Sequence, residues 1–346
     1  MKFSFEETES FGIDISDLSL KIVKVNSSFE LVSFAENSVA PKVCKKGEIQ
    51  EENALAKDIR EILLKVKGEE LNTKRVICSL PEEKCFLDIL RIPSVTDEEI
   101  ESVVMREAEG SIPFPLLEVY FDFEKIIATN KESYQEVLVA ASPKKVVDVY
   151  LRVLKKARLN AVAMEIESLA ITRALIKKDV VMNPVLIIDF GANRSSFIIY
   201  SGTSIRFTST IPVSSKELTQ SLADKLKITF AQAEKLKKKH GLKGTKKIAE
   251  ALKPPLDDLA GRIKNHLNYY NSHTPKYYKD KKLEKIILCG GGANLQGLGE
   301  FLTTKLKINV ELGNALNNIS QSNLKPDKAL SFTTAIGLAL RANYGH

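Results

Sequence analysis

The chain has 346 residues, a formal net charge of +7 and a hydrophobic fraction of 44%. Its 17 glycines and 12 prolines are too few for a fibrous or low-complexity protein, and no apolar run approaches the ~20 residues that cross a bilayer. The start, MKFSFEETES, lacks an apolar signal core, and the cysteines show no metal-binding or CxxC spacing. We therefore expect a cytoplasmic protein of about two domains, without a transmembrane segment and with reduced, mostly buried thiols.

The first part of the chain predicts three strands, a helix and a fourth strand. From residue 12, GIDISDLSLKIVKV and FELVSFAENSV contain the β-branched and alternating apolar residues typical of strands joined by tight turns. After Pro41, apolar residues recur at spacings of three and four over 52–68, which predicts an amphipathic helix. RVICSL, at 75–80, predicts a further buried strand.

The next segment predicts a small α+β part inserted into this first half. Strands are expected around Leu87–Leu90, at VYFDFEKI and at EVLVAA, and an acidic helix is expected at 97–109. Pro113 and Pro115 should end that helix, because the residue before a proline avoids the helical conformation. These strands should leave a surface on which a partner peptide could dock.

The second half repeats the order of the first. VLIIDFGANRSSFIIY, from residue 185, and SIRFTSTIPV again predict three strands that end near a proline, Pro212. A helix is expected next, because Ser214 and Glu217 form a capping-box pattern at its start. KIILCG, at 285–290, predicts the last strand. Each half therefore has the predicted order βββαβ.

Polar or glycine-rich turns follow equivalent strands. Asp14 ends the first strand of the first half, and Asp189 ends that of the second. Backbone N–H groups of such turns can bind phosphate oxygens, and Mg²⁺ prefers carboxylates together with waters. A third turn places Gly290–Gly292 before a helix, where glycine permits close approach of a ligand and a helix N-terminus attracts anions. One such turn is usually structural, but three in a duplicated pattern favour a polyphosphate site.

Positive charge is concentrated in one segment. Residues 225–285 contain 17 Lys/Arg and 6 Asp/Glu. Such a segment can attract anionic lipid, nucleic acid or an acidic partner, and a solvated lysine surface is the alternative. Lysine outnumbers arginine 40 to 11 and no nucleic-acid-binding motif is present, so no specific nucleic-acid partner is expected.

Together, the three turns resemble those of the actin-like ATPase superfamily. GIDISDLSLK is similar to its first phosphate loop, IDFGANRSS to its second and CGGGANLQGL to its adenosine-binding loop. MEIESLAITRAL (164–175) and SFTTAIGLALRA (331–342) resemble its two connecting helices, and AEKLK resembles the segment that contacts ribose and adenine. The resemblance implies bound ATP and Mg²⁺, with Asp14 and Asp189 holding the metal through water. The implied ATP-binding residues are Asp14, Ser16, Asp17, Ser19, Lys21, Asp189, Gly191, Ala192, Asn193, Arg194, Ser195, Glu234, Lys237, Gly290, Gly291, Gly292, Ala293 and Leu295.

Within this superfamily the chain resembles the PilM family of type IV pilus assembly proteins. The similar pieces include SLP, the helix after Thr96, EAEGSIPFP, EVLVAASPKKVVDVY, AMEIESLAITRAL and GGGANLQGLGEFLTTKLKINVELGNAL. The resemblance implies a cytoplasmic ATP-binding scaffold that is peripheral on the inner membrane through protein partners and serves twitching motility. The implied partners are the N-terminal cytoplasmic tail of PilN, inner-membrane pilus proteins, pilus motor ATPases and a second copy of the chain.

The first turn departs from the family pattern. Family loops commonly read D-I-G-x-S-x-x-K, whereas Ser16 here lacks the conformational freedom of glycine and Asp17 adds negative charge where phosphates are expected. Arg194 in the second turn could compensate. We therefore expect ATP binding with slow or absent hydrolysis. Glu165 and Glu167 are the candidate catalytic residues that would orient water, with a role at a helix start as the alternative.

We predict an α/β protein with the actin-like ATPase fold, in which two duplicated βββαβα halves surround a nucleotide cleft and the first half carries an inserted α+β subdomain. One alternative is an FtsA-like cell-division or cytoskeletal ATPase, which usually carries a C-terminal amphipathic helix that LALRANYGH does not resemble. Another is a sugar or acetate kinase, for which no substrate-pocket base is found. The expected segments are 10–74 (first half), 75–155 (inserted subdomain), 156–183 (connecting helix), 184–228 (second half), 229–283 (helical, basic subdomain), 284–330 (adenosine loop) and 331–346 (C-terminal connecting helix).

Overall fold

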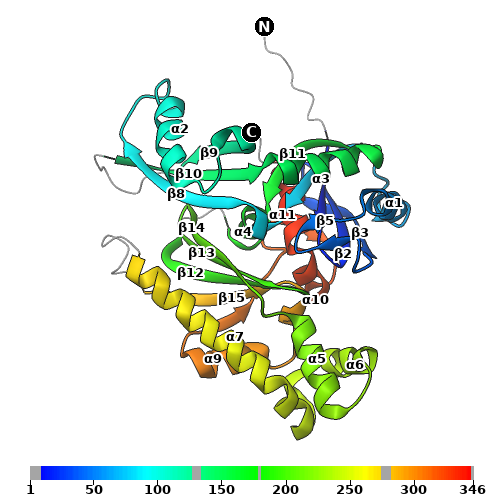
Figure 1. Cartoon of the computed structure of the whole chain (residues 1–346). Coiled ribbons are helices and arrows are strands. Elements are labelled where there is room, and N and C mark those ends of the chain that lie inside the picture. Colours follow the sequence, from blue (N-terminus) through cyan, green and yellow to red (C-terminus); the bar gives the residue numbers. More distant parts are fainter. Residues whose placement is uncertain (1–8, 127–133, 178–180, 274–281, 344–346) are drawn as a thin grey trace. The chain divides into compact units, whose positions relative to one another are not determined.

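The computed structural model describes residues 9–126, 134–177, 181–273 and 282–343, and its ribbon is drawn in Figure 1. The chain forms two compact units. The first unit comprises Met1–Lys125, Ser133–Lys177 and Asn314–His346, and the second comprises Ile126–Glu132 and Lys178–Gly313. Within the described ranges, no helix is long and apolar enough to span a membrane.

The first unit is built on a large sheet that, in the described part of the chain, has seven strands. β1, β2 and β3 are antiparallel neighbours, whereas β7 pairs in parallel with β1, and β11 with β7. The predicted order of three strands, a helix and a strand is therefore confirmed. Across the sheet the strands are β11 (Asn160–Ile166), β7 (Arg75–Leu80), β1 (Phe11–Ile15), β2 (Ser19–Val25), β3 (Glu30–Ser38) and β17 (Gln321–Ser322), with β6 (Lys67–Gly68) paired to β3.

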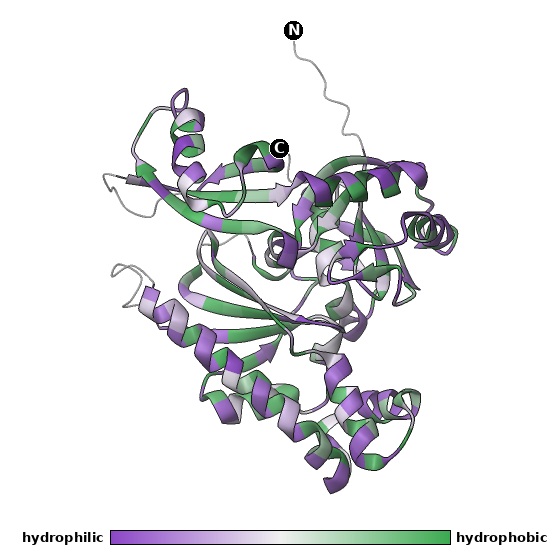
Figure 2. Cartoon of the chain, in the orientation of Figure 1, coloured by the Kyte–Doolittle hydropathy of each residue, from purple (hydrophilic) through white to green (hydrophobic). Residues whose placement is uncertain are grey.

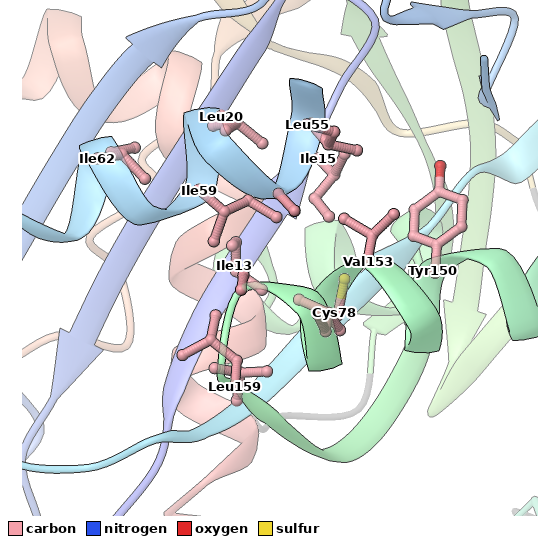
Figure 3. Packing of buried hydrophobic residues seen from close by; sticks show 14 of the residues in the cluster. Ile13, Ile15, Leu20, Leu55, Ile59, Ile62, Cys78, Tyr150, Val153 and Leu159 are labelled. Atoms are coloured by element: carbon pink, nitrogen blue, oxygen red, sulfur yellow. The ribbon is translucent and has the colours of Figure 1, made fainter. Parts of the chain in front are cut away.

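Helices cover both faces of this sheet. On one face, Ile59 of α1 and Val153 of α3 lie in the same buried cluster as Ile13 of β1 (Figure 3). On the other face, Ala170 of α4 and Leu338 of α11 pack with Ile77 of β7. The helices are α1 (Glu52–Leu63), α3 (Lys144–Lys156), α4 (Glu167–Leu175) and α11 (Thr333–Arg341). Short elements of this unit are β4 (Cys44–Lys45), β5 (Glu48–Ile49), η1 (Glu82–Lys84), η2 (Leu116–Glu118), α10 (Pro326–Ala329) and η5 (Leu330–Phe332).

A separate three-stranded sheet lies within the predicted inserted segment. Its order is β8 (Phe86–Pro93), β10 (Tyr134–Pro143) and β9 (Val119–Lys125), all antiparallel, and α2 (Ile100–Ser111) packs on it through Val104 and Ala108. The helix expected at 97–109 thus begins three residues later and ends at Ser111. β7 and α3, which the sequence boundaries placed in the insertion, contribute instead to the large sheet and its core.

The second unit repeats the topology of the first around its own five-stranded sheet. Antiparallel β14, β13 and β12 are followed by parallel β15 and β16, which matches the order of β3, β2, β1, β7 and β11. The duplicated pattern predicted from the sequence is therefore present. The strands are β12 (Val181–Phe190), β13 (Ser195–Gly202), β14 (Ser204–Ile211), β15 (Lys285–Cys289) and β16 (Val310–Leu312). The helices are α5 (Ser215–Leu226), α6 (Phe230–His240), η3 (Gly241–Lys243), α7 (Lys246–His273), η4 (Gly291–Asn294) and α9 (Leu298–Leu306).

Local signals set the start of α5, but not the start of α4. Ser214 and Glu217 form both hydrogen bonds of the predicted capping box. The connecting helix expected at 164–175 begins only at Glu167, because Asn160–Ile166 is the strand β11. The alanines and Met164 in this segment favour helix on propensity alone. Parallel pairing with β7 overrides that preference, which is a tertiary effect.

The long helix α7 contains Pro254 and Pro255 in its interior. Proline has no N–H, so Pro255 leaves the carbonyl of Ala251 without its usual helical donor. The hydroxyl of Ser221, on α5, donates to this carbonyl at 2.6 Å. The α5–α7 contact therefore gives the Ala251 carbonyl a hydrogen-bond donor in place of the missing proline N–H. Figure 2 shows that hydrophobic and hydrophilic residues alternate along α7.

We expect His266 on α7 to make the second unit less stable in mild acid. Burial, and then the charge of Arg262, lower the pKa of His266, whose ring packs edge-on to Phe197 at 5.1 Å. The unfolded chain therefore binds a proton more readily than the folded chain, so stability falls as the pH drops through the unfolded value of ~6.5. Urea unfolding of wild type and His266→Phe at pH 7.5 and 5.5 measures the stability that each protein loses on acidification. The variant should lose less stability on acidification, and equal losses would contradict the expectation.

Candidate functional site

The first predicted turn is centred on the buried carboxylate of Asp14, which is 4% exposed. The hydroxyl of Ser79, at the end of β7, donates to Asp14 Oδ1 at 3.1 Å. The same hydroxyl accepts the backbone N–H of Ile15 at 3.1 Å. Ser79 was not among the sequence-derived site residues, because 65 residues separate it from Asp14 and no local motif marks it.

A cation and further hydroxyls lie on the other side of Asp14. Lys21 Nζ is 3.7 Å from Asp14 Oδ2 and donates to the hydroxyl of Ser19 at 2.8 Å. The Ser16 hydroxyl is 3.4 Å from Asp14 Oδ2, and its backbone N–H closes the turn onto the carbonyl of Ser19. Ser16 does not have a positive φ, so serine can replace glycine here without strain. The structure therefore gathers Asp14, Ser16, Ser19 and Lys21 at one turn.

Asp17 has a structural task in the same turn. Its carboxylate accepts the backbone N–H groups of Lys46 and Gly47, at 3.1 and 2.9 Å, both of which have positive φ in the β4–β5 hairpin. The hydroxyl of Tyr150, on α3, donates to the carbonyl of Gly47 at 2.9 Å. Hydrogen bonds to a charged acceptor are roughly twice as strong as neutral ones. The acidic residue that departs from the family pattern thus fastens the hairpin to the first turn.

The second predicted turn follows β12 in the second unit. Asp189 lies opposite Cys289, the last residue of the parallel strand β15. The N–H of Gly191 donates to the carbonyl of Arg194 at 3.0 Å, and a side chain at Gly191 would meet that carbonyl at 2.6 Å. Ser195 is fully buried, and its hydroxyl donates to Val213. Ser195 therefore contributes to the packing of the turn.

The tip of the second turn is seated on the first turn of α5. The N–H of Ser215 donates to the carbonyl of Gly191 at 3.0 Å, and that of Lys216 donates to Ala192 at 3.1 Å. Ala192 and Asn193 themselves are exposed. These backbone bonds hold the turn in one conformation while its tip remains accessible.

The glycine turn after β15 packs directly against the second turn. Gly290 has a φ of +80°, and a Cβ there would lie 2.1 Å from Asp189 Oδ1. A Cβ at Gly292 would lie 2.7 Å from both the ring and the carbonyl of Phe190. The close packing of the two turns on each other therefore accounts for both glycines. Ala293 and Leu295, also predicted to contact nucleotide, are 1% and 8% exposed.

The helix expected immediately after the glycines begins later than predicted. Gly291–Asn294 forms the short η4, and α9 starts only at Leu298, after Gly297 with a φ of +84°. This left-handed backbone conformation favours glycine, and it separates η4 from α9. The N-terminus of α9 is thus not at the glycine turn, and its dipole does not act directly there.

The buried Lys237 and the partly exposed Glu234 form a polar network between α6 and α5. Lys237 is 4% exposed, and its ammonium donates to the carbonyl and hydroxyl of Ser215 and to the hydroxyl of Thr219, each at 2.7 Å. It also pairs with Glu234 at 2.8 Å. Burial lowers the pKa of Lys237, against the effect of Glu234. Burial raises the pKa of Glu234, but hydrogen bonds from Lys237 and Thr219 outweigh it and leave this pKa below its usual value.

α6 and η3, which follows it, also contact the segment after the glycine turn. The N–H of Leu242 donates to the carbonyl of Gln296 at 2.8 Å, and the Gln296 amide donates to the carbonyl of Lys239 at 3.1 Å. The second turn, the glycine turn and α6 are therefore neighbours in the second unit. Gln296 was not predicted, although its place just after the glycines in CGGGANLQGL was visible in the sequence.

Glu165, one candidate catalytic residue, is enclosed by two arginines. Its side chain is 2% exposed. Both Arg173 Nη atoms donate to its carboxylate, one of them at 2.7 Å, and Arg341 Nη1 is 3.3 Å away. Arg173 also donates to the carbonyl of Gly337. These contacts join β11, α4 and α11. The Glu165 carboxylate is thus placed as the counterion of Arg173 and Arg341.

Glu167, the other candidate, lies at the N-terminus of α4. Its carboxylate accepts the backbone N–H of Glu82 at 3.3 Å, while the Glu82 carboxylate accepts the N–H of Ser168 at 3.1 Å. Each glutamate therefore caps the start of the helix that carries the other. The contacts of Glu167 match the alternative expected from the sequence, a role at a helix start.

The remaining predictions concern metal, thiols and the basic segment. Among the described residues, no three His, Cys, Asp or Glu side chains come together to hold a metal ion. The four cysteines are free thiols, as expected, and burial raises the pKa of Cys44 and Cys85 to about 12. The basic segment 225–285 covers α6 and α7, with Lys235 and Lys239 exposed on α6, and residues 274–281 lie outside the described ranges.

Comparisons with known proteins identify the family. A family model described as type IV pilus assembly protein PilM matches residues 12–343. A solved chain of a PilM–PilN type IV pilus biogenesis complex is 26% identical, with 98% of this chain and 100% of that chain covered and a TM-score of 0.82. This match favours the pilus family over the cell-division alternative.

More distant structures share the fold. The ethanolamine utilization protein EutJ from Carboxydothermus hydrogenoformans is 18% identical, with 97% of this chain and 89% of that chain covered and a TM-score of 0.60. MreB5 of Spiroplasma citri, solved with ADP, is 13% identical, with 96% of each chain covered and a TM-score of 0.56. These similarities confirm the predicted actin-like ATPase fold. With its duplicated sheets and a family match over nearly its whole length, the chain belongs to the PilM family of type IV pilus assembly proteins.

Proposed function

We propose that this chain is an ATP-binding scaffold of type IV pilus assembly that binds the N-terminal cytoplasmic tail of PilN. The observation that carries the proposal is the match to a solved chain of a PilM–PilN complex over 98% of this chain at a TM-score of 0.82. The scaffold would act in the cytoplasm, peripheral on the inner membrane through its partners. It would connect PilN to the pilus motor ATPases, and self-association belongs to the same proposal.

The residues of the first unit fit a magnesium nucleotide. Asp14 offers a carboxylate that is already oriented by a hydroxyl donor, and Lys21 places a cation 3.7 Å from it. Mg²⁺ is usually held by one or two carboxylates together with phosphates and waters. Two backbone N–H donors partly screen the negative charge of Asp17, which reduces its repulsion of a phosphate at this turn. Bound Mg²⁺ would neutralise phosphate charge.

The residues of the second unit fit a nucleotide through backbone groups. The tip at Ala192–Asn193 is exposed and the turn is fixed by bonds to α5. Asp189 is proposed to bind Mg²⁺ through water. Lys237 and Glu234 would shape the adenosine side indirectly, because the Lys237 ammonium is engaged by Ser215, Thr219 and Glu234.

The contacts of Glu165 and Glu167 support the proposal of slow or absent hydrolysis. Glu165 is paired to Arg173 and Arg341, and Glu167 accepts a backbone N–H, so neither carboxylate is presented as a mobile base. A group that orients attacking water must reach it at hydrogen-bond distance. We therefore propose that nucleotide binding, rather than turnover, is the property that this scaffold uses.

The test is calorimetric titration of the purified chain with Mg·ATP, and then with the PilN tail peptide. Binding of both is expected. Asp189→Ala and Asp189→Asn should weaken ATP binding strongly in Mg²⁺ and little in EDTA, because the metal link is lost. Asp258→Ala, which removes an exposed pair with Arg262 on α7, is the control and should change neither affinity. If the peptide binds and ATP does not, the ATP-binding part of the proposal fails and the protein is a passive adaptor. Binding of neither would refute the whole proposal.

A further inference from the structure

We infer that Ser79 is a positioning residue for the magnesium nucleotide, acting through Asp14. This inference rests on the proposed nucleotide binding and adds a residue that no sequence motif marks. Ser79 is 1% exposed at the carboxyl end of β7, beside the first turn. It has no direct path to solvent, so its effect on a ligand must pass through the side chain that it holds.

Two hydrogen bonds fix the direction of the Ser79 hydroxyl. Its oxygen accepts the N–H of Ile15 at 3.1 Å, and its hydrogen is directed to Asp14 Oδ1 at 3.1 Å. A serine hydroxyl has one donor hydrogen and two acceptor lone pairs. Because the Ile15 N–H occupies an acceptor position, the single hydrogen is left for Asp14. The donor is therefore oriented before any ligand arrives.

Asp14 needs such a partner because its carboxylate torsion is soft. The terminal torsion of aspartate is broad and roughly two-fold, so its plane is set by its neighbours. Lys21 attracts Oδ2 from 3.7 Å and the Ser16 hydroxyl is 3.4 Å from the same oxygen. The Ser79 hydroxyl holds the other carboxylate oxygen, Oδ1. Mg²⁺ demands near-ideal octahedral geometry, so an unheld carboxylate would bind the hydrated ion less well.

Ser79 differs in this respect from other buried serines of the same sheet. Ser33, on β3, is also fully buried, and its hydroxyl donates at 2.7 Å to the backbone carbonyl of Glu69. Its contact with the backbone serves the sheet, and neither Asp14 nor Lys21 is its partner. Ser33→Ala therefore removes a comparable buried hydrogen bond without touching the proposed metal side.

The experiment titrates wild type, Ser79→Ala, Ser79→Thr and Ser33→Ala with ATP in Mg²⁺ and in EDTA. Hydrogen bonds to charged groups contribute about 1.5–3 kcal/mol, which corresponds to about tenfold or more in affinity. Ser79→Ala should weaken Mg·ATP binding by about tenfold and binding in EDTA by less than about twofold. Ser79→Thr keeps the hydroxyl on a strand-compatible residue and should restore most of the Mg²⁺-dependent affinity. Ser33→Ala should retain wild-type affinity in both buffers.

A second readout needs no nucleotide. Melting temperatures of the ligand-free wild type, Ser79→Ala, Asp14→Ala and the double variant form a double-mutant cycle. The combined loss should be clearly smaller than the sum of the single losses, because each change removes the same bond. Additive losses would overturn the inference, as would equal weakening by Ser79→Ala in Mg²⁺ and EDTA. Failure of the wild type to bind ATP would overturn this inference together with the nucleotide-binding part of the proposed function, and the wild-type titration shows it before any variant is tested.

Discussion

Replacing Gly337 by alanine should destabilise the first unit by at least about 3 kcal/mol, the upper end of ordinary overpacking costs. A Cβ at this position of α11 would lie 1.8 Å from the carbonyl oxygen of Ala170 and 2.4 Å from its carbonyl carbon. Both atoms belong to the backbone of α4, so no side-chain rotation relieves the clash. The two helices must move apart, which also disturbs the buried contact of Ala170 and Leu338 with Ile77.

Gly261→Ala, on α7, is the matched control for Gly337→Ala. Nothing lies within 4 Å of a Cβ at Gly261, and it is exposed within a helix. Alanine there should stabilise by up to ~1 kcal/mol through helix propensity. Urea unfolding followed by circular dichroism compares the two. A Gly337→Ala variant with the wild-type midpoint would show that the close α4–α11 contact is not required.

The second large effect is expected at Glu165. Glu165→Leu should cost about 2–4 kcal/mol, because removing one partner leaves buried charges without compensation. The expected cost lies below the upper range for buried pairs because the side chains of Arg173 and Arg341 retain 22% and 29% exposure. Arg173 also keeps its bond to the carbonyl of Gly337. The loss comes mainly from the unpaired guanidinium groups.

Glu167→Gln separates this structural effect from a general sensitivity of the segment. Glu167 is also buried, but its carboxylate accepts a backbone N–H, and a glutamine oxygen can accept the same bond. Its loss of stability should therefore be much smaller than that of Glu165→Leu, measured by urea unfolding at pH 7. Equal losses would argue that the arginine contacts of Glu165 contribute little to stability.

The Gly337 and Glu165 sites both lie where α4 and α11 pack together. Gly12 on β1 would place a Cβ 2.5 Å from the carbonyl of Ala335, so β1, α11 and α4 pack backbone to backbone. The first turn follows β1 directly. The first turn therefore follows a strand that α11 contacts closely, and the Gly337 variant reports on the packing that supports it.

The sequence by itself determined the elements whose signals are local. Alternating apolar residues identified β1–β3 and β12–β14, the capping box at Ser214 located α5, and the duplicated order of strands and helix predicted the two sheets. Asp14 and the glycines at 290–292 were recognised because they follow buried strands. These features depend on residues within about one turn or strand of each other, so a linear pattern contains them.

Only the tertiary structure decided which partner each polar side chain has. Asp17 bonds to Lys46 and Gly47, Asp14 to Ser79, and Glu165 to Arg341, at separations of 29 to 176 residues along the chain. β11 is a strand despite the helical preference of its residues, because its backbone pairs in parallel with β7. Pairing and burial depend on neighbours brought together by folding, whereas propensity depends on adjacent residues. For that reason the sequence located the turns of the candidate site, and the fold assigned the side chains that hold them.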